Sequence, residues 1–548
     1  MNQPLLRRWP VALLLVVLLA AAGLRVQHLR ADPPRLLPAL SGSAGIYFDE
    51  GIYSHNARNK LLFGTWITDE WNPFIYNPLL TGIYYLAFRV GGISIPTVKL
   101  VNIGFGLLGL ILFYLAIRSW LSAAAALVLT ALLAGDYYWL MYNRIGLLEN
   151  FSSLCFLLSF YLFVKALADR RFAFWLGAAV MISVLSKYLF VYFLVSTSLA
   201  VVIHARQKRD GKFPMLYLAG LLSLGGLWLF SLYLPFSATF GKIGRGWGML
   251  SLPRSLHQAA ANLLANPLPR YLALMPLPFF LALLFFALVI VRWLWRRPSG
   301  HDPVGWFVWF WFAGGFLQMG LLNYRPLRYY LPLIPALYLA VARLLRDREQ
   351  ARQLAGRIIL MAVPLLVLAG GLFLFLLVPP SAFFAIPLWL RILVYGALAW
   401  LLLDPLLPGG IRRWSGAVLA VVILLCALSL YHRHFFRYPT YHLEAAASFI
   451  KNLPPDSLVM GQEAPRLTLE TGFKALMAYE NWFNDRDPFR LHRPTHLLVL
   501  NKFNDAELGW IRRRFPEQAG NFVLQKKFPV WDTTLSLYRV VYPEAPDR

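Results

Sequence analysis

The chain has 548 residues, of which 59% are hydrophobic and 14% are charged, and its mean hydropathy is +0.56. Soluble domains carry about 25% charged residues, so the composition excludes a soluble globular protein and indicates one that crosses a membrane many times. The net charge of +26 does not indicate nucleic acid, because no basic stretch is interleaved with aromatic residues on a soluble fold. We therefore expect the lipid bilayer, and no nucleic acid, among the partners.

The apolar segments of the chain predict thirteen membrane-spanning helices. A span needs about 17–25 mostly apolar residues. The expected spans lie at about 10–26, 98–117, 120–136, 150–167, 172–186, 189–204, 216–234, 272–292, 305–322, 329–345, 356–377, 383–402 and 414–431. Residues 1–435 are thus predicted to form a transmembrane domain.

Lysine and arginine clusters assign a sidedness to these spans. They are Arg7-Arg8, Lys165 with Arg170-Arg171, Arg206 to Lys212, Arg292 to Arg297, Arg343 to Arg352 and Arg412-Arg413. All fall on one side, which the positive-inside rule makes cytoplasmic. An odd number of spans then places the C-terminal tail outside. A basic start followed by Ala20-Ala21-Ala22-Gly23 also fits a cleaved signal peptide, which would leave the later sidedness unchanged.

Two adjacent acids, Asp49 and Glu50, follow the first span. Only 13 acidic residues precede residue 436, and hydrocarbon tolerates carboxylates poorly, so each is a candidate for function. A carboxylate at the membrane edge can take a proton from a polar reactant in water while the other reactant stays in lipid. Asp49 also suits the cap of a helix beginning at Gly51, a role compatible with catalysis.

The first external loop, about 27–97, is rich in aromatic residues. Residues 52–62 have helix-like spacing, and residues 79–90 form a second apolar stretch. Amphipathic aromatic segments lie in the interface plane of a membrane. They either anchor the loop or form a lipid-facing floor for an active site, and the neighbouring acids favour the floor.

Further charged residues are expected on the same external face. Arg144 and Glu149 stand at the start of the fourth span, and Lys187 separates two spans. Arg325 and Arg328 stand among tyrosines at another span entrance, where guanidinium groups suit phosphate. The structural alternatives are a local Arg144–Glu149 ion pair, a snorkelling Lys187 and an interfacial arginine anchor.

The tail, residues 436–548, carries 15 basic and 13 acidic residues and is predicted to be a soluble domain. Apolar runs predict strands at 457–461, 496–500, 522–524 and 535–541. Helical patterns lie near 440–452, 465–480 and 504–515, so a small α/β layer is expected. The tail has no dinucleotide or Walker motif, which gives no reason to expect a nucleotide.

Metal and disulfide chemistry receive little support. His55 lies close to the Asp49-Glu50 pair in sequence, but no second histidine stands at ligand spacing. A divalent metal is therefore possible but unsupported, and the cofactor is unknown. Cys155 and Cys426 both fall in apolar segments and form no disulfide framework.

An ordered set of motifs resembles the GT-C integral-membrane glycosyltransferases, and within them the family of protein O-mannosyltransferases and the lipid A aminoarabinose transferase. The set comprises Asp49-Glu50, the helix-like stretch 51–64 before Trp66, Asn77-Pro78-Leu79, Arg144 to Glu149, Leu185-Ser186-Lys187 and Arg328 to Pro335. The resemblance covers about 1–345. Some relatives have Lys-Pro-Pro where this chain has Asn77-Pro78-Leu79, and the tail does not resemble the β-trefoil of eukaryotic O-mannosyltransferases.

The resemblance implies a polytopic helical membrane protein of GT-C fold, with a small soluble C-terminal α/β domain. It implies transfer of a sugar from a polyprenyl-phosphate donor to an acceptor lipid, glycan or protein outside the cytoplasmic membrane. Asp49 is the expected general base in an inverting displacement. The remaining expected roles are catalytic for Glu50 and Glu149, phosphate-binding for Lys187, Arg328, Arg325 and Arg144, and lining of the substrate cleft for Tyr53, His55, Tyr76, Asn77 and Tyr329.

Three other functions fit a polytopic membrane protein. A transporter or flippase of lipid-linked sugars would show inverted repeats and polar residues at mid-membrane, and the sequence shows neither. A non-catalytic scaffold would not need a charge-rich external cleft. A polymerase or ligase of lipid-linked glycans would use the same chemistry as the transferase.

Overall fold

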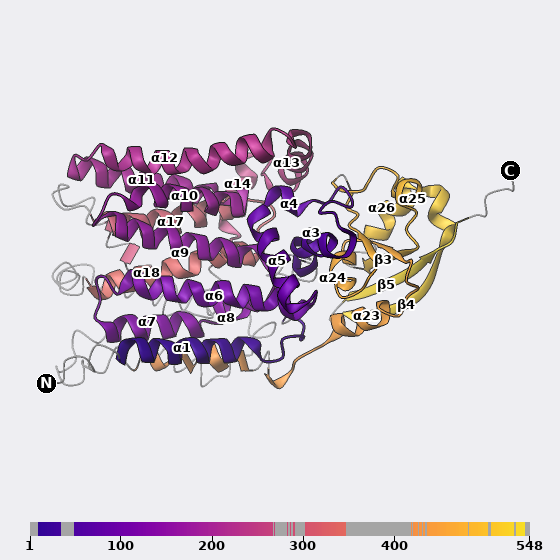
Figure 1. Cartoon of the computed structure of the whole chain (residues 1–548), viewed down its shortest axis with the longest axis horizontal. Helices are drawn as coiled ribbons and strands as arrows, with labels where there is room; N and C mark the ends of the chain where they lie inside the picture. Colours follow the sequence, from indigo (N-terminus) through magenta and orange to yellow (C-terminus); the bar gives the residue numbers. More distant parts are fainter. Residues whose placement is uncertain are drawn as a thin grey trace.

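The computed structural model describes residues 9–33, 49–266, 302–346 and 436–542 except 481, 502–505 and 531–532, with scattered positions in 268–290 and 418–432. Long helices lie side by side in a bundle, and a smaller sheet-containing domain sits at one end of it (Figure 1). The predicted spans 356–377 and 383–402 lie outside the described residues, 272–292 lies largely outside them, and 414–431 lies partly outside them.

The bundle contains helices at most of the predicted span positions. They are α1 (Trp9–Val26), α6 (Ile95–Ile117), α7 (Ala123–Gly135), α9 (Leu148–Ala166), α10 (Phe172–Ser186), α11 (Val191–Lys208), α12 (Lys212–Trp228), α17 (Pro303–Leu321) and α18 (Ile334–Arg346). Within the described part of the chain, six helical segments are long and apolar enough to cross a membrane. The chain is therefore a multi-pass membrane protein.

Shorter helices link and extend the bundle. They are α8 (Tyr137–Asn143), η2 (Tyr188–Phe190), η3 (Leu229–Tyr233), α13 (Ser237–Ser251), α14 (Leu256–Leu264) and η4 (Leu327–Leu333). The predicted span 120–136 is one arm of a broken helix, because α8 follows α7 at an angle of 59°. Asp136 stands at the break, where its carboxylate accepts from the backbone N–H groups of Tyr138 and Trp139 and caps α8.

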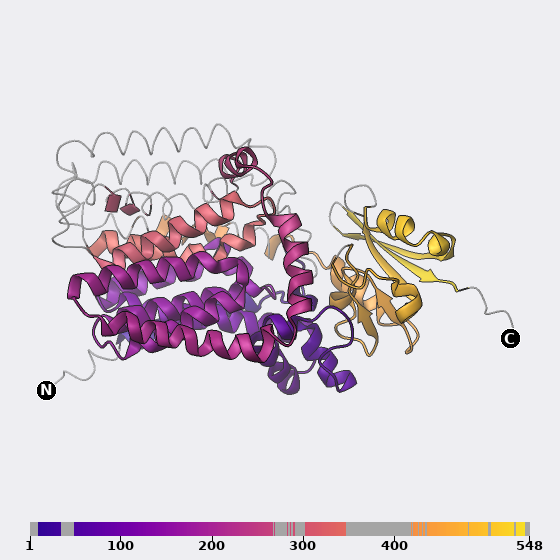
Figure 2. The ribbon, with the colours of Figure 1, turned by 90° about the horizontal axis from the view of Figure 1, so that it is seen from above.

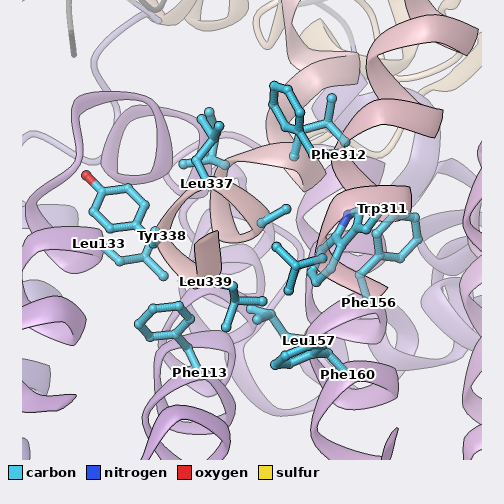
Figure 3. Close-up of a cluster of buried hydrophobic side chains, with 14 of the residues drawn as sticks. Phe113, Leu133, Phe156, Leu157, Phe160, Trp311, Phe312, Leu337, Tyr338 and Leu339 are labelled. Carbon is cyan, nitrogen blue, oxygen red and sulfur yellow. The ribbon is translucent and has the colours of Figure 1, made fainter. Parts of the chain in front are cut away.

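Large apolar side chains fill the interior of the bundle (Figure 3). Phe156 stacks on Phe193 with ring centroids 3.7 Å apart and meets Trp311 edge to face. Helices α10 and α12 approach backbone to backbone, because a Cβ on Gly177 or on Gly220 would meet a carbonyl oxygen of the facing helix at 2.0 Å. This packing fixes the ends of α9 and α10, from which two of the predicted site residues project.

The first loop folds into α3 (Asp49–Phe63), α4 (Pro73–Tyr76) and α5 (Pro78–Gly91). These helices lie between the end of the bundle and the C-terminal domain (Figures 1 and 2). Helix α5 exposes Leu79, Leu86 and Val90, as expected of a segment in the membrane interface. The expectation of an interfacial helix is wrong for α3, because most of its residues, including Asp49 and Asn59, are buried between the two domains.

The C-terminal part forms a mixed five-stranded sheet of order β2-β1-β3-β5-β4 with helices around it. Its strands are β1 (Leu458–Met460), β2 (Lys474–Leu476), β3 (His496–Asn501), β4 (Phe522–Val530) and β5 (Thr533–Val540). Its helices are α23 (His442–Ile450), α24 (Ala464–Leu467), α25 (Pro488–His492), α26 (Ala506–Arg514) and η7 (Pro516–Asn521). The four predicted strands and the helices near 440–452 and 504–515 are confirmed. The helix predicted at 465–480 is wrong, since α24 ends at Leu467 and β2 pairs in parallel with β1.

Candidate active site

Asp49 is the first residue of α3, the helix that lies between the end of the bundle and the C-terminal domain (Figure 1). Its side chain is buried, and its Oδ2 lies 3.1 Å from Nε of Arg328 in η4. The helix begins two residues earlier than the sequence indicated, so Asp49 stands in its first turn. The acid thus faces a cation instead of water.

Glu149 and Lys187 complete a compact group with this pair. Glu149 lies in the first turn of α9, and Lys187 directly follows α10; Lys187 Nζ and Glu149 Oε1 are 2.5 Å apart. Nε of Arg328 lies 3.6 Å from the same Glu149 oxygen, so Arg328 faces two carboxylates. We call Asp49, Glu149, Lys187 and Arg328 the Asp49 cluster.

Tyrosines surround the cations of the Asp49 cluster. Lys187 Nζ lies 3.6 Å from the ring centroid of Tyr329, close enough for a cation–π contact. Nη2 of Arg328 donates to the hydroxyl of Tyr324 at 3.3 Å. Tyr53 stands one turn after Asp49 on α3, and burial together with the nearby Asp49 and Glu149 charges raises the pKa of its phenol. The tyrosines hold both cations without neutralising them.

Burial changes the acidity of Asp49. It raises the pKa of the Asp49 carboxyl from 3.8 to about 7; the positive charge of Arg328 opposes the change and the negative charge of Glu149 adds to it. A carboxyl with a pKa near the working pH is suited to take up and release a proton. The Asp49 cluster therefore combines a proton acceptor with two cations at one edge of the bundle.

The comparisons with known proteins agree with this architecture. Residues 76–234 match the family described as dolichyl-phosphate-mannose-protein mannosyltransferase. The structure of ArnT from Cupriavidus metallidurans bound to undecaprenyl phosphate superposes with a TM-score of 0.56 and 16% identity, over 97% of this chain and 98% of that one. The chain has the GT-C fold. The apo state of the same ArnT gives a TM-score of 0.55 and 17% identity, over 96% of this chain and 97% of that one. No curated protein sequence is significantly similar.

Glu50 points away from the Asp49 cluster of this GT-C protein. Its Oε2 lies 3.2 Å from Nη2 of Arg466, and its Oε1 lies 3.7 Å from Nζ of Lys99. The backbone N–H of Gly146 also donates to Oε1, at 3.3 Å. The two adjacent acids therefore have different cationic partners, and Glu50 connects α3 to α6 and to the C-terminal domain.

Arg144 contacts residues that are far apart in the chain, whereas Arg325 makes a local contact. Arg144 donates to the hydroxyl of Tyr431 and to the backbone carbonyls of Gln27 and His28. The side chain of Arg325 donates to the carbonyl of Leu322, three residues earlier. A phosphate-binding role for these two arginines stays a prediction.

His55 is completely buried on α3, with its Nε2 3.8 Å from Oδ2 of Asp69. This distance would allow an ion pair between His55 and Asp69, but the two side chains do not carry the charges that an ion pair needs. Burial lowers the pKa of His55 to about 3 and raises the pKa of Asp69 to about 8, so both groups are neutral at pH 7. Within the described residues, no three His, Cys, Asp or Glu side chains are grouped to hold a metal ion.

Asn77, and with it the preceding Tyr76, lies near Lys187 because the Asn77 side chain contacts the backbone of Ser186. The Asn77 side chain caps α5 by accepting from Leu80 N–H, and it donates to the carbonyl of Ser186 at 2.8 Å. The buried Tyr76 hydroxyl has no hydrogen-bond partner within the described part of the chain. Asn77 thus fixes α5 against the end of α10, immediately before Lys187.

The sequence interpretation missed three residues that contact the predicted acids and arginines: Tyr324, Lys99 and Arg466. Tyr324 lies four residues before Arg328, and the Tyr-Arg spacing was a usable signal for it. Lys99 is a lysine just inside a predicted span, which is itself unusual. Arg466 gave no signal, because it lies in a soluble domain far along the chain.

Proposed function

We propose that this protein transfers a sugar from a polyprenyl-phosphate donor to an acceptor on the outer side of the cytoplasmic membrane. The observation that carries the proposal is the Asp49 cluster, in which a carboxyl with a pKa of about 7 lies beside two buried cations. The GT-C fold and the ArnT structure bound to undecaprenyl phosphate support a lipid-phosphate donor.

In this mechanism the acceptor hydroxyl oxygen attacks the anomeric carbon of the donor. Its proton passes to Asp49, and the bond between the anomeric carbon and the phosphate oxygen breaks, releasing prenyl phosphate. Lys187 and Arg328 stabilise the charge that develops on the leaving phosphate. A single displacement inverts the anomeric centre.

Donor binding also changes the surroundings of Asp49. A phosphate offers Arg328 oxygen acceptors in competition with the Asp49 carboxylate, which lies 3.1 Å from Nε. When Arg328 turns to the phosphate, Asp49 loses its stabilising cation and becomes a stronger base. Glu149 keeps Lys187 oriented toward the same site, at 2.5 Å.

The direct test is transfer by the purified protein in lipid nanodiscs, using a prenyl-phosphate sugar labelled in the sugar. Label moving to a membrane glycolipid, glycan or protein fraction supports the proposal, and mass spectrometry of the product identifies the acceptor. In sealed proteoliposomes, movement of the labelled donor between leaflets without any transfer would support a flippase instead.

Replacing Arg328 with glutamine is expected to lower kcat/KM for the donor by about ten- to a hundredfold, since a charge-assisted hydrogen bond contributes about 1.5–3 kcal/mol. Lysine at this position should rescue the loss only in part, because a point charge does not reproduce the guanidinium fork. The matched control is Arg89→Gln, which removes an exposed arginine of α5. Wild-type donor kinetics in Arg328→Gln would leave Arg328 only the structural role of a buried partner for Asp49 and Glu149.

The C-terminal domain is proposed to face the outside, as the charge pattern and the odd number of predicted spans require. An alkaline phosphatase fused after the C-terminus should be active, and a green fluorescent protein fused there should be dark. The reverse result would invert the sidedness of the whole chain, because α3 and the C-terminal domain are in contact and therefore lie on the same side of the membrane. It would place the Asp49 cluster, which adjoins this domain, on the cytoplasmic side.

A further inference from the structure

The C-terminal domain makes an unusually close contact with the first turn of α3. An ideal Cβ on Gly51 would lie 2.2 Å from the backbone nitrogen of Arg466 in α24. A real Cβ does not approach backbone atoms so closely, so only glycine lets the two helices meet here. The contact occurs two residues from Asp49.

Arg466 extends this contact into the membrane domain. Its side chain is 4% exposed, and its Nη2 lies 3.2 Å from Oε2 of Glu50, which is 1% exposed. Lys99 is the other cation near Glu50, and its Nζ also donates to the backbone carbonyls of Leu29 and Ala31. The C-terminal domain therefore supplies one of the two cations that face an acid adjacent to the proposed base.

The hydrogen bonding of Arg466 is incomplete. Among the residues that the structure describes, its buried Nε has no hydrogen-bond partner, and the Glu50 oxygen that its Nη2 faces at 3.2 Å accepts no aligned hydrogen bond. Burying a guanidinium with an unpaired donor is unfavourable, so stability alone does not explain an arginine here. Positioning of the adjacent acid does explain it.

The geometry of α3 shows what Arg466 positions. Asp49 and Glu50 are consecutive in one rigid helical turn, with Asp49 beside Arg328 and Glu50 beside Arg466. Any rotation of the turn that moved Glu50 away from Arg466 would also move the Asp49 carboxylate. A contact such as that between Glu50 and Arg466 can hold a neighbouring reactive group in productive geometry.

We propose that Arg466 is a positioning residue, through which the C-terminal domain fixes the first turn of α3 and aims Asp49 at the reacting centre. This inference rests on the proposed function, in which Asp49 is the base. It assigns the C-terminal domain a direct part in the transfer reaction, so the transferase site is complete only when that domain is docked.

The test compares the full-length Arg466→Gln variant with the full-length wild-type protein, both in nanodiscs. Active sites are counted by the stoichiometry of radiolabelled prenyl-phosphate binding. Donor affinity should stay within about twofold of wild type, since Lys187 and Arg328 are unchanged. Turnover per bound donor should fall about ten- to a hundredfold, the range seen when outer partners that orient reactive groups are removed. The matched control, Arg490→Gln, removes an 81% exposed arginine of the same domain and should change nothing.

Two further variants separate positioning from simple structural damage. Arg466→Lys keeps the charge and should restore part of the turnover per bound donor; it also serves if Arg466→Gln does not fold. The double variant Glu50→Gln/Arg466→Gln should lose less turnover than the product of the two single losses, because both changes remove the contact between Glu50 and Arg466.

Wild-type turnover per bound donor in Arg466→Gln, or in Arg466→Lys when the glutamine variant is unfolded, would overturn the inference. So would losses that multiply in the double variant. Asp49→Asn, measured in parallel, distinguishes a failure of the positioning role of Arg466 from a failure of Asp49 as the proposed base. If Asp49→Asn is inactive and Arg466→Gln is normal, only the positioning role fails; if Asp49→Asn is active, the proposed base fails and the inference fails with it.

Discussion

Replacing Asp49 with asparagine is expected to lower kcat by roughly 10²–10⁴-fold, the usual contribution of a general base. Asparagine keeps the size of the side chain and fits the first turn of α3, but it does not accept a proton at neutral pH. The measurement is transfer at saturating donor, normalised to donor-binding sites. Glu50→Gln should reduce turnover less, because Glu50 contacts Arg466 and Lys99 and not the Asp49 cluster.

The pH dependence offers an independent check on the same residue. The pKa of Asp49 is raised to about 7, and the base must be deprotonated to act, so wild-type kcat/KM should fall as the pH drops below about 7. The residual activity of Asp49→Asn should lack this acid limb. Near-normal turnover in Asp49→Asn would move the base elsewhere: to Glu50 if Glu50→Gln is inactive, and otherwise to Glu149.

Replacing Arg58 with methionine is expected to undock the C-terminal domain from α3. Its buried guanidinium donates to the backbone carbonyls of Thr468, Leu469, Thr471 and Phe473 at 2.6–3.0 Å. Methionine fills a similar volume but leaves all four carbonyls without this donor. The free energy that holds the two domains together should fall by several kcal/mol, since each buried carbonyl left without a donor costs about 1–3 kcal/mol.

Limited proteolysis in nanodiscs measures this undocking. In Arg58→Met the segment around residues 464–473 should be cleaved far faster than in wild type, while the helical bundle stays protected. Arg490→Met, at an exposed position of the same domain, should leave the cleavage rate unchanged. Equal protection in both variants would show that the carbonyl contacts of Arg58 do not hold the domains together.

The sequence predicted the membrane helices well where a single physical signal dominates. Long apolar runs such as 305–322 correspond closely to α17, because burial in lipid and burial in the bundle both require apolar side chains. The short strand β2 was missed, because three residues are too few for a periodic pattern and its pairing with β1 is set by the sheet. Helix α3 was misread, because its polar residues are buried by a domain that no local pattern reveals.

For the candidate site, the sequence identified the residues but not all of their partners. Asp49, Glu149, Lys187 and Arg328 were predicted from their rarity on the outer face of an apolar chain, and the structure brings them together. Their catalytic roles stay predictions. The partner of Glu50 was unpredictable, because Arg466 is one of many arginines in a nearly neutral tail and only the tertiary fold selects it.

The position of α3 between the bundle and the C-terminal domain constrains how the protein is made. Arg58 and its carbonyl partner in Leu469 are 411 residues apart. At synthesis rates of about 5–20 residues per second, the ribosome needs roughly 20 to 80 s to cover that distance. During that interval α3 is already outside the first span, while its polar face has no protein partner. Helix α3 is therefore among the first segments to be synthesised, whereas its contacts with the C-terminal domain form only after most of the chain has been made.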